Sequence, residues 1–94
     1  MFIYTIDPTL PLVFKELLPL ASKWQNIGTF LEIPSGTLEN IKSNNPHKVE
    51  DCLRDMITEW LATTNPHPTW KGLVETVKMM NGKISEEICI KYCV

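Results

Sequence analysis

Apolar residues recur at helical spacing along almost the whole chain. The first stripe consists of Leu10, Val13, Phe14, Leu17 and Leu18. These residues are three and four positions apart, so they would share one face of a helix. Pro19 then predicts the end of that helix or a kink in it. No segment alternates between apolar and polar residues in the manner of a half-buried strand.

A second helix is predicted close after Pro19. Ser22 and Gln25 have the spacing of a capping box, in which each side chain satisfies a free backbone N–H of the other residue. The apolar side of this helix would consist of Trp24, Ile27 and Leu31. Gly28 lies on the same side, and its missing side chain would let a neighbouring helix approach closely.

Three further helices are separated by turn-forming residues. A short third helix begins after Pro34, with Ser35 as its N-cap, and ends before the Asn44-Asn45-Pro46 turn. The fourth helix has the clearest period in the sequence, with an apolar stripe made of Val49, Cys52, Leu53, Met56, Ile57, Trp60 and Leu61. The fifth carries apolar residues from Trp70 to Met80, and the pair Asn81-Gly82 is expected to end it.

A sixth helix is predicted to start at Ser85, because Glu86 and Glu87 would then occupy the first turn, where the helix dipole favours acids. Its inward face would hold Ile84, Ile88 and Tyr92. The segments together predict an all-α, single-domain bundle of about six short helices. Residues 1–7 would form an N-terminal extension and residues 8–94 the domain.

Composition and charge narrow the functional classes. The 94 residues suffice for one domain, and an apolar content of 44% is too high for a disordered tail. The net charge is −2, so the chain lacks the basic surplus with which nucleic-acid-binding domains neutralise phosphates. No stretch approaches the ~20 apolar residues of a membrane span, and the N-terminal apolar run is too short for a signal peptide.

The cysteines favour a reducing, cytoplasmic setting. Cys52, Cys89 and Cys93 are an odd set, whereas a small secreted domain more often shows an even set with framework spacing. Cys89 and Cys93 are four residues apart, unlike the short paired loops of a structural zinc site. Cys52 lies on an apolar stripe and is expected to be a small buried hydrophobe. We predict no metal and no cofactor.

Catalysis has little support in the sequence. Nucleophile elbows, phosphate-binding glycine loops and paired metal-binding histidines are all missing, and the chain has only four glycines. We therefore predict that the protein is not an enzyme.

Several segments, in their order and spacing, resemble the death domain. Residues 21–34 are similar to the second helix of that family, with Trp24, two following apolar positions and an exit of the form LGI-P. Residues 38–41 match its short third helix, and residues 49–61 match its fourth, which typically ends in a Trp. Residues 68–77 resemble its fifth helix, with the pattern tW..Lv.aL. The resemblance covers about residues 10 to 90.

The resemblance implies a six-helix antiparallel Greek-key bundle, the death fold, without an active site. Such modules serve as adaptors in apoptotic or inflammatory-type signal transduction and associate homotypically through three asymmetric contacts. One joins helices one and four to helices two and three. Another joins the fourth helix and its following loop to the loop before helix six, and the last joins helix three to neighbouring loops. The implied partners are other death-fold domains or further copies of the chain, with no nucleic acid and no membrane insertion.

The large apolar residues are expected to form the core. Trp24 and Trp70 lie on apolar stripes and are predicted core anchors, together with Leu53 and Leu73. Trp60 is placed with them. An alternative for Trp60, at a helix end, is partial exposure at an interface, where Trp is enriched.

Charged residues predict an interaction surface. Asp51, Asp55 and Glu59 make the fourth helix acidic, and Lys71, Lys78 and Lys83 make the region of the fifth helix basic. Glu50 or Asp51 can pair with Arg54, whereas Asp55 and Glu59 have no basic residue at helical spacing. A solvated acidic face is the simpler interpretation. The alternative is a head-to-tail contact of Asp55 and Glu59 with Lys78 and Lys83 of another copy, which would propagate instead of closing as a dimer.

Two other functional classes compete with this interpretation. A small helix-turn-helix nucleic-acid binder also consists of short helices joined by tight turns, but the charge argues against it. An enzyme would need a concave site that the sequence does not indicate. Within the death fold, caspase-recruitment, death-effector and pyrin modules are sister families. The tW..Lv pattern and the terminal Trp of the fourth helix favour the death domain proper.

Overall fold

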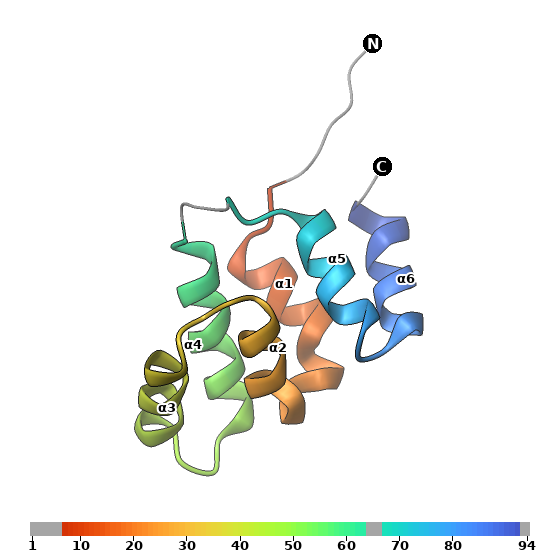
Figure 1. Ribbon diagram of the computed structural model, residues 1–94. Helices are drawn as coiled ribbons and strands as arrows, with labels where there is room; N and C mark the ends of the chain where they lie inside the picture. Colours follow the sequence, from red (N-terminus) through yellow and green to blue (C-terminus); the bar gives the residue numbers. More distant parts are fainter. Residues whose placement is uncertain (1–6, 64–66, 93–94) are drawn as a thin grey trace.

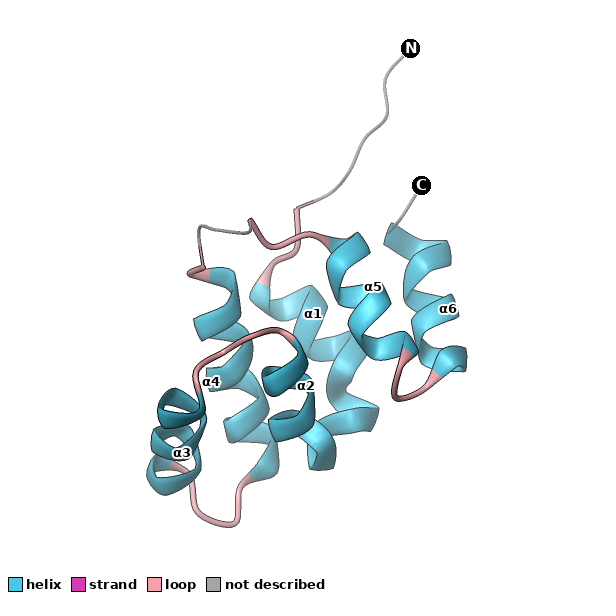
Figure 2. Cartoon of the chain, in the orientation of Figure 1, coloured by secondary structure: helices cyan, strands magenta, loops and turns pink. Residues whose placement is uncertain are grey.

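The computed structural model describes residues 7–63 and 67–92, and all the regular structure in these residues is helical (Figures 1 and 2). The helices are α1 (Leu10–Leu17), the 3-10 helix η1 (Leu18–Lys23), α2 (Trp24–Phe30), α3 (Ser35–Asn44), α4 (Val49–Leu61), α5 (Trp70–Lys78) and α6 (Gly82–Tyr92). The predicted all-α class is confirmed. Residues 1–6 of the predicted N-terminal extension lie outside the described residues, and the domain boundary at residue 8 stays a prediction.

The first helix breaks where the sequence predicts. α1 ends at Leu17, Pro19 stands at the start of η1, and Leu20 leaves the helical region with φ −107 and ψ 18. Proline has no N–H to donate, so the chain tightens into a 3-10 helix instead of continuing α1. The change of direction buries Leu20 and Ala21, in a segment that contacts α1, α2 and α4.

The capping box predicted at Ser22 and Gln25 is wrong. α2 begins at Trp24 without a side-chain cap. The reason is that η1 runs directly into α2 and supplies a partner, since the N–H of Trp24 donates to the carbonyl of Ala21. Gln25 Nε2 instead donates to Glu39 Oε1 on α3 at 3.2 Å.

The C-terminus of α2 forms a Schellman motif with an unusual residue in its key position. The N–H of Glu32 donates to the carbonyl of Thr29, and the N–H of Ile33 donates to the carbonyl of Gly28, both at 3.0 Å. This motif requires a left-handed residue, usually glycine. Here that residue is Glu32, with φ 67. A side chain in this conformation costs about 1–2 kcal/mol.

The turn before α6 also differs from the prediction. Asn81-Gly82 was expected to end the fifth helix, but α5 already ends at Lys78 and Gly82 begins α6. Asn81 Oδ1 accepts the N–H groups of Lys83 and Ile84, both at 3.1 Å, so it acts as the N-cap. Ser85, the predicted start, is buried inside the first turns, and its hydroxyl donates to the carbonyl of Val74 at 2.7 Å.

The core is built around α4, which contacts α1, η1, α2 and α3, while α2 also contacts α5 and α5 packs against α6. In Figure 1, α5 and α6 lie side by side. The five residues predicted as core anchors are all buried, with exposed fractions of 5% for Trp24, 6% for Trp60, 3% for Trp70 and 0% for Leu53 and Leu73. The indole of Trp60 therefore lies in the core, not in the alternative, exposed position.

Gly28 permits a close helix packing, as predicted. A Cβ at this position would lie 2.6 Å from Leu38 Cδ2 of α3 and 3.1 Å from Met56 Cγ of α4. Both distances are shorter than ordinary van der Waals contact, so α3 and α4 approach α2 through the space that a side chain would fill.

The last helix is fastened to the first by one carboxylate. Glu16 of α1 has a side chain that is only 9% exposed. Its carboxylate accepts a hydrogen bond from Tyr92 Oη at 2.9 Å and forms an ion pair with Lys91 Nζ at 3.3 Å. The ring of Tyr92 also stacks on Trp70 of α5, with centroids 3.9 Å apart. The two contacts with Glu16 join α1 to α6 across 75 and 76 residues. In residues 7–63 and 67–92, no helix has the length and apolar character to cross a membrane.

Candidate interaction surface

The acidic residues of α4 are partly engaged within the chain. Asp51 Oδ1 and Arg54 Nη1 form an ion pair at 2.9 Å. The pairing is therefore the i, i+3 alternative, not the one with Glu50. The guanidinium of Arg54 also lies 4.8 Å from the centre of the Phe14 ring, a cation–π contact that joins α4 to α1. Asp51 is thus the least available of the three predicted acids.

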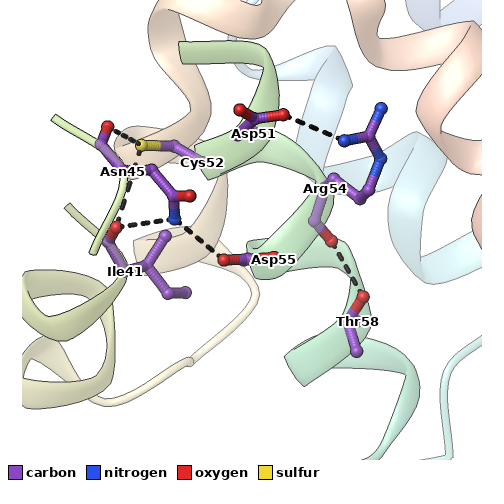
Figure 3. A network of polar contacts seen from close by, with 7 residues as sticks. All are labelled: Ile41, Asn45, Asp51, Cys52, Arg54, Asp55 and Thr58. Carbon is purple, nitrogen blue, oxygen red and sulfur yellow. Dashed lines mark hydrogen bonds and ion pairs between the residues drawn. The ribbon is translucent and has the colours of Figure 1, made fainter. Parts of the chain in front are cut away.

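Asp55 is held in place by the turn between α3 and α4 (Figure 3). Asn45 Nδ2 donates to Asp55 Oδ2 at 2.8 Å and to the carbonyl of Ile41 at 3.0 Å. The thiol of Cys52 donates to the carbonyl of Asn45 at 3.4 Å. The Asn45 side chain therefore adds a second donor to a carbonyl of the last turn of α3, which already accepts the backbone N–H of Asn45, and orients an exposed carboxylate of α4 at the same time.

Cys52 is a buried, protonated thiol in this network. Its exposed fraction is 3%. Burial raises the pKa of the thiol, and the negative charges of Asp55 and Asp51 raise it further. The residue acts as a small hydrophobe and a weak donor. Cys89 of α6 is half-buried and is a free thiol, and Cys93 lies outside the described residues.

Glu59 is the most available of the predicted acids. It is exposed one turn beyond Asp55. Within the described part of the chain, the two ion pairs are Arg54–Asp51 and Lys91–Glu16, so the Glu59 carboxylate pairs with no described cation. We call these two exposed residues, Asp55 and Glu59, the acidic edge of α4.

The predicted basic residues are all exposed. Lys71 and Lys78 are seven residues apart on α5, and Lys83 is in the first turn of α6. None of the three forms an ion pair with a described residue. Figure 1 shows α4 and the turn between α5 and α6 on opposite sides of the bundle. Lys78 and Lys83 therefore cannot form ion pairs with the acidic edge of their own molecule.

The structure also shows a groove that the sequence did not reveal. The groove lies at the ends of α2 and α4 and the start of α5. It is lined by residues 30–32, Trp60, residues 67–69, Gly72 and Thr76, and its volume is about 190 Å³. We call it the α2–α5 groove. Phe30 on its rim is 47% exposed. The available signal was that Phe30 is apolar but lies off the stripe formed by Trp24, Ile27 and Leu31.

Sites for small ligands are poorly developed in the described residues. The α2–α5 groove is smaller than the ~300–1,000 Å³ typical of ligand pockets. A second hollow, of about 310 Å³, is lined only by residues 47–51 at the start of α4, so no groups converge on it from different helices. Across residues 7–63 and 67–92, no cluster of three His, Cys, Asp or Glu side chains could hold a metal ion.

Comparison of the chain with protein-family models, with curated proteins and with solved structures gave no match in any of the three. A functional assignment therefore depends on the residues and surfaces of the chain itself.

Proposed function

We propose that this chain is a protein–protein interaction module of the death-fold type. In this proposal its helices follow the antiparallel Greek-key order, and the module acts as an adaptor by associating with other copies or with related death-fold domains in signal transduction. Support comes from the sequence resemblance over about residues 10–90, and from helices that begin and end close to the matching segments. The buried tryptophans of α2, α4 and α5 agree with that resemblance.

The observation that carries the proposal is the separation of opposite charges on the two sides of the bundle. The acidic edge lies on α4, and Lys78 and Lys83 flank the turn between α5 and α6. A second copy can present its lysines to the acidic edge of the first, leaving its own acidic edge free for a third. Such a heterologous contact propagates into a ring or a helical filament.

The electrostatic contribution to this contact is modest for each pair. Exposed ion pairs contribute about 0.2–1 kcal/mol each. Complementary charge nevertheless selects partners and steers encounter, because like charges brought together oppose the wrong register. Asp55 is already oriented by Asn45, so less side-chain freedom is lost when it meets a lysine.

Charge reversal tests the proposed contact. We expect Glu59→Lys to weaken self-association in sedimentation velocity and to reduce capture of partners from a panel of death-fold domains. Glu50→Lys is a matched control, since Glu50 is exposed on the same helix but nine residues earlier, on the other edge of its solvent face. If wild type and Glu59→Lys self-associate and capture partners equally, the proposed contact is contradicted. DNA binding by micromolar protein that weakens with salt would instead favour the helix-turn-helix alternative.

A further inference from the structure

The α2–α5 groove is lined by Glu32, whose left-handed backbone conformation is unfavourable for a residue with a side chain. Glu32 occupies the left-handed position of the Schellman motif at the end of α2, where glycine relieves strain. Its backbone hydrogen bonds need no side chain. Strained residues concentrate at sites where a side chain is needed for function. The side chain of Glu32 is exposed and lines the groove, so the carboxylate itself is the candidate for that role.

The groove has the size and chemistry to accept one apolar side chain beside a cation. Its volume of about 190 Å³ suits a single side chain, not a helix or an extended segment. Phe30 leaves nearly half its surface in solvent, and the lining includes Trp60 and Pro68, which are both buried. Glu32 lines the groove, and Glu59 directly precedes the lining residue Trp60, so carboxylates lie on the α2 and α4 sides of the groove, while Lys71 directly precedes Gly72 on the α5 side. An occupant is therefore expected to be apolar with basic neighbours.

The chain itself carries a side chain of this kind. Met79, at the end of α5, is 65% exposed. It follows Lys78 directly, and Lys83 lies four residues further on, across a short turn. Ile90 of α6 is 73% exposed, but it lies one helical turn from the acids Glu86 and Glu87, and its neighbour Lys91 is already paired with Glu16. Met79 has one acid at that spacing, Glu75, against Lys78 and Lys83, which pair with no described residue. Charge complementarity thus selects Met79 and not Ile90.

We propose that the α2–α5 groove receives Met79 of a second copy of the chain, with Glu32 facing Lys78 of that copy. This inference rests on the proposed function, and it adds an apolar anchor to the charged contact. Met79 contacts Phe30 in the groove, while Lys83 of the same copy reaches toward Glu59. The groove and Met79 are different parts of the molecular surface. Each copy can therefore insert its Met79 into one neighbour and receive the Met79 of another, so the contact runs head to tail.

Comparing a substitution of Met79 with the same substitution of Ile90 tests whether Met79 anchors the contact. We expect Met79→Ser to weaken self-association by at least tenfold in sedimentation velocity over a concentration series. Ile90→Ser, an equally polar change at a more exposed apolar residue, should leave it unchanged. Equal effects of the two variants would overturn the proposal, and so would a wild-type protein that stays monomeric at every concentration.

A charge exchange tests the pairing of Glu32 with Lys78. Glu32→Lys and Lys78→Glu should each weaken self-association, and the double variant should recover most of it. Glu32→Gly gives a second readout, because it should raise the melting temperature by relieving strain while weakening self-association. A double variant as weak as the single ones, or Glu32→Gly associating as wild type, would overturn the assignment of Glu32.

The outcomes also separate this inference from the proposed function. If Glu59→Lys disrupts association and capture of death-fold domains while Met79→Ser and the Glu32 variants do not, the groove is not used and the charged contact remains. If the groove variants disrupt self-association but no death-fold domain is captured by the wild type, the groove is an interface between copies and the assignment to death-fold signalling fails.

Discussion

At the scale of single residues, the missing side chain of Gly28 allows α3 and α4 to pack closely against α2. Gly28→Ala gains about 1 kcal/mol of helix propensity, but its Cβ would overlap Leu38 and press on Met56. Overpacking of this kind costs about 1–3 kcal/mol. We therefore expect Gly28→Ala to lower the free energy of unfolding in urea titrations followed by circular dichroism.

Gly36 of α3 supplies the control for this prediction. Nothing lies within 4 Å of the Cβ that Ala would add there, so Gly36→Ala should keep the gain in helix propensity and raise the stability. If both glycine variants were stabilised, α3 and α4 would not press on α2 as the distances indicate.

The sequence predicts the burial and packing of a residue well where one local pattern determines them. The closeness of Gly28 to its neighbours follows from its place on an apolar stripe, and the burial of Cys52 follows in the same way. Glu32 shows the limit. Its left-handed backbone depends on where α2 ends, and the sequence has no glycine at this position to signal a Schellman motif.

At the scale of elements, the contact of α6 with α1 depends on the phenol of Tyr92. Tyr92→Phe keeps the ring that stacks on Trp70 but removes the donor to Glu16. Loss of a hydrogen bond to a charged acceptor costs about 1.5–3 kcal/mol, and less where water reaches the group. We expect a lower urea midpoint for Tyr92→Phe at neutral pH.

The same contact predicts a dependence on alkaline pH. Burial raises the pKa of Tyr92, and its hydrogen bond to Glu16 raises it further. A raised pKa means that the folded state holds the proton more tightly. The contribution of Tyr92 to stability is therefore complete below about pH 10, the ordinary pKa of tyrosine, and is lost as the pH rises through the higher folded-state pKa.

Urea midpoints of wild type and Tyr92→Phe at increasing pH measure this effect. The difference between the two proteins should be constant from neutral pH to mildly alkaline pH and should shrink above about pH 10. Lys91 is common to both proteins, so its contribution to stability largely cancels in the difference. A difference that stays the same at high pH would show that Tyr92 does not donate to Glu16.

Helix ends were harder to predict than helices. The apolar stripe of α4 gave its bounds correctly, because thirteen residues of regular spacing leave little choice. The spacing of Ser22 and Gln25 predicts a cap, but η1 continues into α2 and leaves no free N-terminus there. The pair Asn81-Gly82 predicts the end of α5, whereas the Asn81 side chain caps α6. Cap residues favour both the end of one helix and the start of the next, so tertiary packing decides.

At the scale of the whole molecule, the core tolerates little loss of buried side-chain volume. Trp24 is 5% exposed and contributes the largest side chain of α2 to the core. Removing a buried Trp costs about 3–5 kcal/mol, against a total stability of about 5–15 kcal/mol for a typical domain. We expect Trp24→Ala to be largely unfolded or to melt at much lower temperature, as measured by near-ultraviolet circular dichroism and thermal unfolding.

The exposed variants Met79→Ser and Ile90→Ser are the controls for Trp24→Ala. Surface substitutions of this kind change stability by at most about 0.5 kcal/mol, so both should melt close to the wild type. A Trp24→Ala variant that melts with them would mean that the core does not close around this indole.

The surfaces were only partly visible in the sequence. The acidic edge and the lysines could be identified from charge and spacing, because exposed charges on a helix keep their periodicity. The internal partner of Asp55 could not, since Asn45 reaches it only through the fold of the turn. The α2–α5 groove combines residues from α2, α4 and α5 that are up to 46 positions apart, and no local pattern encodes such a recess.

The fastening of α6 to α1 has a consequence for how the protein can be tethered. Both ends of the described chain leave the bundle at the pole opposite the turn between α3 and α4 (Figure 1). A bead, fluorophore or fusion partner linked to either end would project from that pole. Immobilised molecules would then all present the α3–α4 turn outward in the same orientation, whichever end carries the link.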